Sequence, residues 1–292
     1  MYGMEIYPAQ KYADTGMYRL KVVRNELASP FDKKWIAALA LTKQADKLRS
    51  KAETRQQSLQ RYDSAMNTWL ALNDTLHYAK AMRSKGFAQI RLQYYDQAVQ
   101  TFTKLLPLWN QLNDFRAEGF TCLIIGRVYD LQKDYNKSLE YNFNSMPSWK
   151  KANDTDQESF TLMNIGNLYS YLGDKKKGID SFEQALLKNK LSERPSVKAV
   201  ILRDYGNSLM RLGDEESAIQ KYVQSLQQWQ STVNIPEEAR TATLLADHFA
   251  KKTNRKDAIM YYQHALDIWQ KLNFDDEVKK VQDAIRETEK QR

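Results

Sequence analysis

Residues 155–192 read TDQESFTLMNIGNLYSYLGDKKKGIDSFEQALLKNKLS, and this stretch decides the fold. Its first half spaces Leu162, Ile165 and Leu168 three residues apart, which places them on one face of a helix. The tripeptide Leu172-Gly173-Asp174 then ends that helix, with glycine where a helix C-terminus favours it. A second apolar face follows, and it consists of Ile179, Phe182, Leu186 and Leu187. The stretch therefore predicts two helices joined by a tight turn.

The helix pair is copied along the chain with a period of 40 residues. Five of the six tryptophans keep this spacing: Trp69, Trp109, Trp149, Trp229 and Trp269. Asn189 stands where that series lacks a member. A first small-residue column comprises Gly86, Gly126, Gly166, Gly206 and Ala246; a second comprises Ala98, Ser138, Gly178, Ala218 and Ala258. An aromatic column holds Phe102, Phe182, Tyr222 and Tyr262, with Asn142 as the exception. Internal repeats of this kind indicate an elongated array of repeated units, each touching its neighbours.

The repeated columns have a physical purpose. Two antiparallel helices approach closely only where side chains are short, and an aromatic ring fills the space beside that contact. The small-small-aromatic spacing resembles the tetratricopeptide repeat (TPR), whose usual unit is about 34 residues. The longer unit here resembles that of kinesin light chains and bacterial signalling proteins, with extended helices. The resemblance implies an all-α fold, a TPR α-solenoid forming a right-handed superhelix of helix pairs.

We expect three parts along the chain. Residues 1–30 form a short N-terminal β-hairpin or extended segment, residues 31–272 form the TPR array, and residues 273–292 form a C-terminal capping helix. The array holds about six helix pairs, and the first is degenerate because Asp46 stands in the glycine column. The cap is expected because terminal repeats need a polar outer face.

Three prolines interrupt the pattern. Pro107 and Pro147 fall late in second helices, where proline removes a hydrogen bond and clashes with the preceding turn, so we expect kinks or early helix ends. Pro195 follows the unit that lacks its tryptophan, so the connection there should differ from the others.

The N-terminal segment alternates like a strand. Tyr18, Leu20 and Val22 lie two residues apart, Met4 to Tyr7 is a candidate partner strand, and Ala13 to Gly16 a candidate turn. The run from Gly16 to Val22 also resembles the strand that precedes TPR arrays in bacterial proteins with a caspase-like CHAT peptidase. That resemblance implies a regulatory array for a peptidase located outside this chain.

Composition narrows the class of protein. The chain of 292 residues carries a net charge of +8, which permits nucleic-acid binding, but acidic residues are interleaved with the basic ones. It has no long apolar run for a membrane span and no apolar N-terminal stretch for a signal peptide. A single cysteine, Cys122, excludes an internal disulfide and favours a reducing compartment, the cytoplasm.

Catalytic chemistry is not expected. The three histidines share no metal-ligand spacing with Cys122 or with one another, and no glycine-rich phosphate loop is present. We therefore predict no enzyme activity, no catalytic residues, no metal and no cofactor. The periodic tryptophans are interpreted as core residues that cover the junction with the next copy.

We predict that the protein binds its partner in the groove of the superhelix. In TPR proteins this groove is lined by the first helix of each helix pair. By resemblance to peptide-binding members, the groove residues flank the repeated glycine: Arg83, Arg127, Asn164, Asn167, Tyr171, Arg203, Asn207 and Arg211. Leu123 and Met163 would add apolar surface. Asparagine can pair with a peptide backbone and arginine can hold a carboxylate.

Three functions remain open at this point. The first is a non-enzymatic scaffold that binds a protein or peptide, including partners with acidic or carboxylate-bearing segments. The second is a sensor array that controls a CHAT-type peptidase. The third is nucleic-acid binding through the basic surface. No membrane partner is expected, and the sequence leaves the oligomeric state open.

Overall fold

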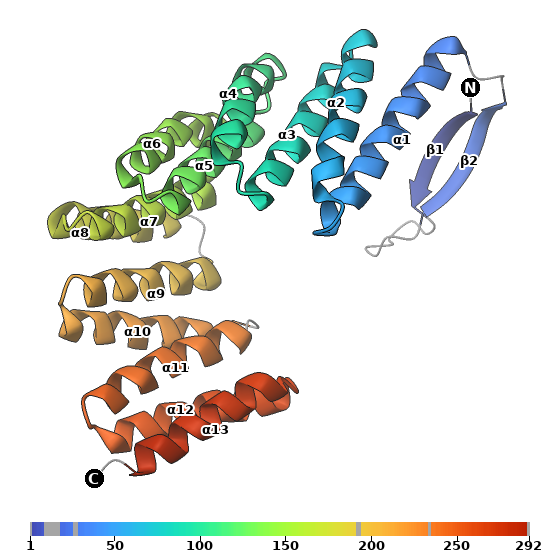
Figure 1. Cartoon of the computed structure of the whole chain (residues 1–292). Coiled ribbons are helices and arrows are strands. Elements are labelled where there is room, and N and C mark those ends of the chain that lie inside the picture. The colour runs from blue at the N-terminus through green and yellow to red at the C-terminus, as the bar shows by residue number, and fades with distance from the viewer. Residues whose placement is uncertain (1, 9–17, 26–28, 191–193, 233–234, 291–292) are drawn as a thin grey trace. The chain divides into compact units, whose positions relative to one another are not determined.

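The structure is a computed structural model that describes residues 2–8, 18–25, 29–190, 194–232 and 235–290 (Figure 1). Helices dominate it, which confirms the all-α prediction. The chain divides into two compact units, residues 1–114 and residues 115–292.

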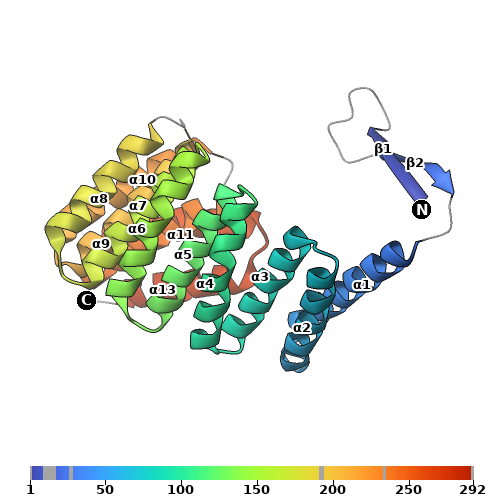
Figure 2. The ribbon, with the colours of Figure 1, turned by 90° about the horizontal axis from the view of Figure 1, so that it is seen from above.

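Within each unit, most helices pack against the next helix along the chain. The first unit comprises β1 (Tyr2–Pro8), β2 (Tyr18–Asn25), α1 (Pro30–Ser50), α2 (Arg55–Ala71), α3 (Thr75–Arg91) and α4 (Tyr95–Gln111). The second comprises α5 (Phe115–Leu131), α6 (Tyr135–Lys151), α7 (Thr155–Tyr171), α8 (Lys175–Asn189), α9 (Pro195–Arg211), α10 (Glu215–Gln230), α11 (Ile235–Lys251), α12 (Arg255–Lys271) and α13 (Asp275–Lys290). Figure 2 shows α5 to α10 as neighbouring helix pairs of the second unit.

Helix length and turn chemistry explain the 40-residue period. Helices α3 to α7 each have 17 residues, and three-residue turns join them, so two helices and two turns make one unit. The middle turn residue has a positive φ, as at Asn73 (54°) and Gly173 (78°). The next residue caps the following helix, since the Asp74 carboxylate accepts from His77 N at 3.0 Å. The expectation of extended helices is confirmed.

Glycines of the first small column lie against the aromatic column, as predicted. A Cβ atom on Gly166 would lie 2.7 Å from the Phe182 ring, and one on Gly206 would lie 2.7 Å from the Tyr222 ring. No side chain fits there without displacing the ring. The glycine thus allows the second helix to approach, and the ring closes the interior of the pair.

The periodic tryptophans are core residues. Trp69, Trp109, Trp149, Trp229 and Trp269 are each at most 2% exposed. Trp69 of α2 packs with Ala38 of α1 and Ala81 of α3, so it covers the junction between one pair and the next. This placement confirms the junction interpretation.

The prolines do not shorten their helices, so the expectation of early helix ends is wrong. Helix α4 continues past Pro107 to Gln111, and α6 continues past Pro147 to Lys151. Both prolines are exposed. Because they face solvent, water can hydrogen-bond to the carbonyl that each proline leaves without a partner.

The connection after α8 differs from the others, as expected. Helix α8 has 15 residues, and Pro195 opens α9 at its first turn. Asn189, in the tryptophan column, is buried and its Nδ2 donates to the carbonyl of Arg194 at 3.4 Å. Asn189 therefore hydrogen-bonds to the backbone of the connection, whereas the tryptophans of this column pack in the core.

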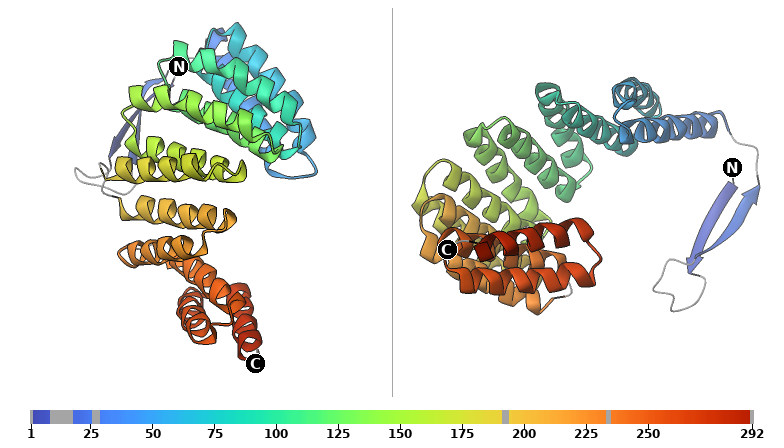
Figure 3. Two further views of the ribbon diagram at one scale, coloured as in Figure 1. Left: turned by 90° about the vertical axis from the view of Figure 1, so that its left-hand side faces the viewer. Right: turned by 60° about the horizontal axis from the view of Figure 1, so that its bottom comes forward.

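The two ends of the chain carry the elements that the sequence predicts. Strands β1 and β2 pair antiparallel with Met4 opposite Val22, while the candidate turn at residues 13–16 lies outside the described residues. Helix α1 begins with a capping box between Ser29 and Asp32. At the other end α13 packs beside α12 (Figure 3). Val281 of α13 is buried.

Candidate functional site

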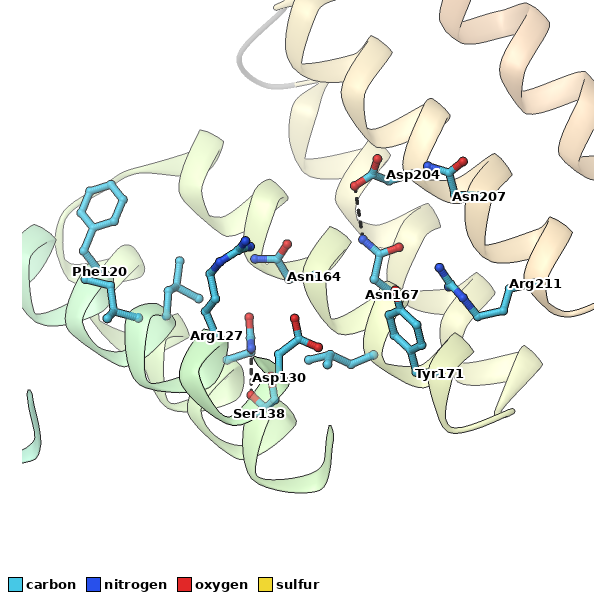
Figure 4. Close-up of a pocket in the computed structure, with 14 residues that line it drawn as sticks. Phe120, Arg127, Asp130, Ser138, Asn164, Asn167, Tyr171, Asp204, Asn207 and Arg211 are labelled. Carbon is cyan, nitrogen blue, oxygen red and sulfur yellow. Dashed lines mark hydrogen bonds between the residues drawn. The ribbon is translucent and has the colours of Figure 1, made fainter. Parts of the chain in front are cut away.

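The second unit contains a pocket of about 440 Å³ on the face of its first helices (Figure 4). Helices α5, α7 and α9 supply most of the lining, and α6 supplies Ser138 and Asn142. Six of the eight predicted groove residues line it: Arg127, Asn164, Asn167, Tyr171, Asn207 and Arg211. The repeat explains this grouping, because successive first helices present the same columns to one side.

Two of the predicted arginines lie elsewhere. Arg83 belongs to the first unit, where its guanidinium lies 5.9 Å from the centre of the Trp109 ring. Arg203 does not line the pocket, because it forms ion pairs with Glu237 of α11 and with Asp204 at 3.4 Å. Met163 is buried, so the expected apolar surface from this residue is absent.

One wall of the pocket is fixed by a hydrogen-bond network around Asn167. Its Nδ2 donates to Asp204 Oδ2 at 3.3 Å, and its Oδ1 accepts from Ser208 Oγ at 2.8 Å (Figure 4). Both ends of the amide are therefore occupied. Asn167 ties α7 to α9 and sets the distance between them.

Arg211 is held by an aromatic stack. Its guanidinium carbon lies 3.8 Å from the centre of the Tyr171 ring, and it donates to Ser170 Oγ. Tyr171 stacks in turn on Tyr135 of α6, with ring centres 4.9 Å apart. Cation–π contacts of this kind order a long side chain at the rim of the pocket.

Asn207 is fixed at one end only. Its Oδ1 accepts from the Tyr222 hydroxyl at 2.7 Å. Burial raises the pKa of Tyr222 to about 12, so the hydroxyl stays protonated and keeps donating. The amide nitrogen of Asn207 is consequently the end directed to other partners.

Arg127 and Asn164 are two polar residues of the lining that are available to a ligand. Within the described part of the chain, neither side chain forms a hydrogen bond or an ion pair. Figure 4 shows the Arg127 side chain extending from α5 toward Asn164 of α7. A ligand can therefore pair with both without first displacing an internal partner.

Sequence reasoning missed part of the lining. The carboxylates Asp130 and Asp204 and the α6 residues Ser138 and Asn142 all contribute. Asp130 and Asp204 belong to helix faces that the glycine columns already located, so their positions could have been found. The contribution of α6 depends on how deep the pocket extends, which the sequence does not show.

The single cysteine, Cys122, does not have the environment of a catalytic nucleophile. Burial raises the pKa of the Cys122 thiol to about 12, which suppresses the reactive thiolate. Across the described residues, no histidine, cysteine, aspartate and glutamate side chains gather in a group able to hold a metal ion. In the same residues, no helix is both long and apolar enough to cross a membrane.

Comparison with known proteins identifies the repeat in part of the second unit. Family models described as tetratricopeptide repeat match residues 198–271 and residues 161–187. These residues are tetratricopeptide repeats. No curated protein sequence matches this chain.

Solved structures share the fold at low sequence identity. BtubC from P. vanneervenii is 11% identical, with 84% of this chain and 93% of that chain covered, at a TM-score of 0.59. The apo form of RapI is also 11% identical, with 89% and 74% covered, at a TM-score of 0.60. A putative kinesin light chain of P. anserina with nearly identical TPR-like repeats is 9% identical, with 68% and 97% covered, at a TM-score of 0.55. These likenesses establish the TPR fold and leave the link to CHAT peptidases a prediction.

Proposed function

We propose that this TPR protein is a non-enzymatic scaffold that binds an extended peptide segment of a partner protein in the pocket over α5, α7 and α9. One observation carries the proposal. Arg127 and Asn164, which have no partner among the described residues, line a pocket in which Asn167 and Arg211 are already held by internal contacts. Such preorganisation lowers the entropic cost of binding.

The size and lining of the pocket suit a short peptide segment. About 440 Å³ lies in the range of small-ligand sites, so a few residues of a peptide would fill it. Phe120, Leu123 and Ile124 supply apolar surface. Apolar burial would provide most of the affinity, and the polar groups would set orientation.

The available polar groups define how the peptide would lie. The Asn164 amide offers a donor and an acceptor, which match the carbonyl and N–H of a peptide bond. The Arg127 guanidinium offers paired donors for a carboxylate or for backbone carbonyls. More specifically, the bound peptide would place an acidic side chain or its C-terminal carboxylate beside Arg127.

The test starts from a random peptide library displayed on phage and selected on the purified full chain. Fluorescence polarisation then measures the dissociation constants of the selected peptides. We expect the double substitution Arg127→Ala with Asn164→Ala to weaken binding by about tenfold to a hundredfold, because it removes the groups available to pair.

The matched control is Arg255→Ala, which removes an equal charge from an exposed position on α12. It should leave both the circular dichroism spectrum and peptide affinity unchanged. Equal affinity of the double variant and the native chain, or equal losses in both variants, would refute this site. Arg203 is a poor target because its substitution would break the contacts to Glu237 and Asp204.

A further inference from the structure

The pair α5–α6 departs from the other pairs at the aromatic column. An aromatic residue stands there in each of the other pairs in α1–α12: Tyr62, Phe102, Phe182, Tyr222 and Tyr262. In α5–α6 the residue is Asn142, whose Nδ2 lies 2.9 Å from where a Cβ on Gly126 would stand. An asparagine is much smaller than a phenylalanine ring. The lining of the pocket includes Asn142 and Ser138 at this position.

Asn142 brings a buried hydrogen-bond acceptor to this end of the pocket. The residue is only 4% exposed, and its Nδ2 donates to the Ser138 carbonyl at 2.8 Å. That bond fixes the orientation of the amide. Its Oδ1 has no hydrogen-bond partner in the described structure. A buried acceptor without a donor is energetically unfavourable. A hydrogen bond from a ligand to this oxygen would therefore be favourable, because it breaks no internal hydrogen bond.

A carboxylate lies at the same end of the pocket. Asp130 of α5 lines it one turn after Gly126, and Figure 4 shows Asp130 and Ser138 together at the α5–α6 end. The Asp130 side chain makes no hydrogen bond or ion pair to any residue that the structure describes. The pocket's other carboxylate, Asp204, is already paired with Asn167 and Arg203.

We propose that the α5–α6 end of the pocket is a subsite for a basic side chain, Lys or Arg, of the bound peptide. Asp130 would balance the charge and Asn142 Oδ1 would accept one N–H. Lysine and arginine carry donors and no acceptor, which complements a subsite whose two unsatisfied groups are both acceptors. The inference rests on the proposed function and adds that the partner carries a positive charge at a fixed distance from the group bound by Arg127.

The first experiment uses the peptides selected on the native chain. We expect Lys or Arg at one fixed position in them. Replacing that residue by norleucine, which keeps the aliphatic stem, should weaken binding by about tenfold, and Asp130→Asn should weaken binding of the original peptide equally. The combination should weaken binding no further, because both changes remove one interaction.

The second experiment closes the subsite with Asn142→Phe. The protein itself provides the precedent, because a phenylalanine lies against the column glycine in α3–α4 and α7–α8. The variant should keep its circular dichroism spectrum and lose the preference for the basic peptide over the norleucine peptide. Its affinity for the norleucine peptide should remain that of the native chain.

The outcomes separate this inference from the function on which it rests. Binding that depends on Arg127 and Asn164 but not on Asp130 or on a basic residue would refute the subsite and keep the peptide site. A preference that survives Asn142→Phe and Asp130→Asn would also refute it. If no library peptide binds the native chain, both proposals fail.

Discussion

The pairs α5–α6 and α7–α8 lie in the same unit and differ in one informative column. Asp134 and Asp174 cap their second helices, and Gly126 and Gly166 mark the close approach of the two helices. The aromatic column then holds Asn142 in the first pair and Phe182 in the second. Where the ring is present the pair has a closed core, and where it is absent a pocket reaches the interior. Under the proposed function, this column serves stability in one copy and recognition in the other.

Substitution of the aromatic-column residue by alanine should give the largest difference in the free energy of unfolding between the two pairs. Phe182→Ala removes a ring that is 1% exposed and should lower the free energy of unfolding by about 3–5 kcal/mol. Asn142→Ala removes one hydrogen bond and an unsatisfied acceptor, so its cost should be about 1 kcal/mol or less. Urea denaturation followed by circular dichroism measures both. Equal losses would mean that Asn142 supports the core as a ring does.

A methyl group at the column glycine should give the next largest effect. Gly166→Ala would put its Cβ 2.7 Å from the Phe182 ring, and we expect a loss of about 1–3 kcal/mol from overpacking. Gly126→Ala would meet the Asn142 amide nitrogen at 2.9 Å and the Ser138 carbonyl oxygen at 3.2 Å, and the end of an asparagine side chain can move aside more easily than a buried ring. Alanine favours both helices by the same amount, about 1 kcal/mol, so this gain does not separate the variants. Denaturation midpoints should therefore fall less for Gly126→Ala. The reverse order would contradict an open α5–α6 interior.

The helix caps should not distinguish the pairs. Hydrogen bonds from Lys137 lower the pKa of Asp134, and those from Lys177 lower the pKa of Asp174. Because both pKa values are depressed on folding, the carboxylates stabilise the fold above about pH 4, and this contribution is lost as the pH falls through their lowered pKa values. Acid titrations of Asp134→Asn and Asp174→Asn should show the same small change relative to the native chain. A change in only one variant would show that the capped turns are not equivalent.

The last comparison concerns Cys122 of α5, which occupies the position equivalent to Leu162 of α7. Both side chains are buried, and the raised pKa of Cys122, about 12, keeps the thiol protonated. A thiol reagent such as dithionitrobenzoate should react with the native chain far more slowly than with the unfolded chain at mildly alkaline pH. Rapid reaction of the folded protein would mean that α5 opens locally at this position.

The helices could be predicted from the sequence because the residues that end and begin them act on the local backbone. Glycine or asparagine ends a helix and aspartate starts the next, as at Gly173 and Asp174, so the turns need no knowledge of distant residues. The early helix ends expected at the prolines were wrong for the complementary reason, while the alternative, a kink, stays a prediction. The effect of each proline depends on whether water reaches the affected carbonyl, which follows from the exposure of Pro107 and Pro147 in the folded array.

The lining of the pocket could be predicted only where position along the helix was sufficient, and its role as a binding site stays a proposal. Arg127, Asn167 and Asn207 share one column, so they meet in the pocket. Arg203 belongs to a neighbouring column, but its long side chain reaches Glu237 of the next pair instead. Asn142 was visible as an exception to the aromatic column. Its meaning required the depth of the pocket and the lack of a partner for Oδ1, which are properties of the packed helices.

Cysteine protection tests the central claim, peptide binding over α5, α7 and α9, most directly. Because the native cysteine is buried, one added cysteine reports alone. Ile124→Cys places a thiol in the lining of the pocket, and Met260→Cys places one on the exposed face of α12. A saturating amount of the selected peptide should slow the reaction of dithionitrobenzoate with the first by about tenfold and leave the second unchanged. Unchanged labelling at position 124, with protection only at position 260, would contradict the account.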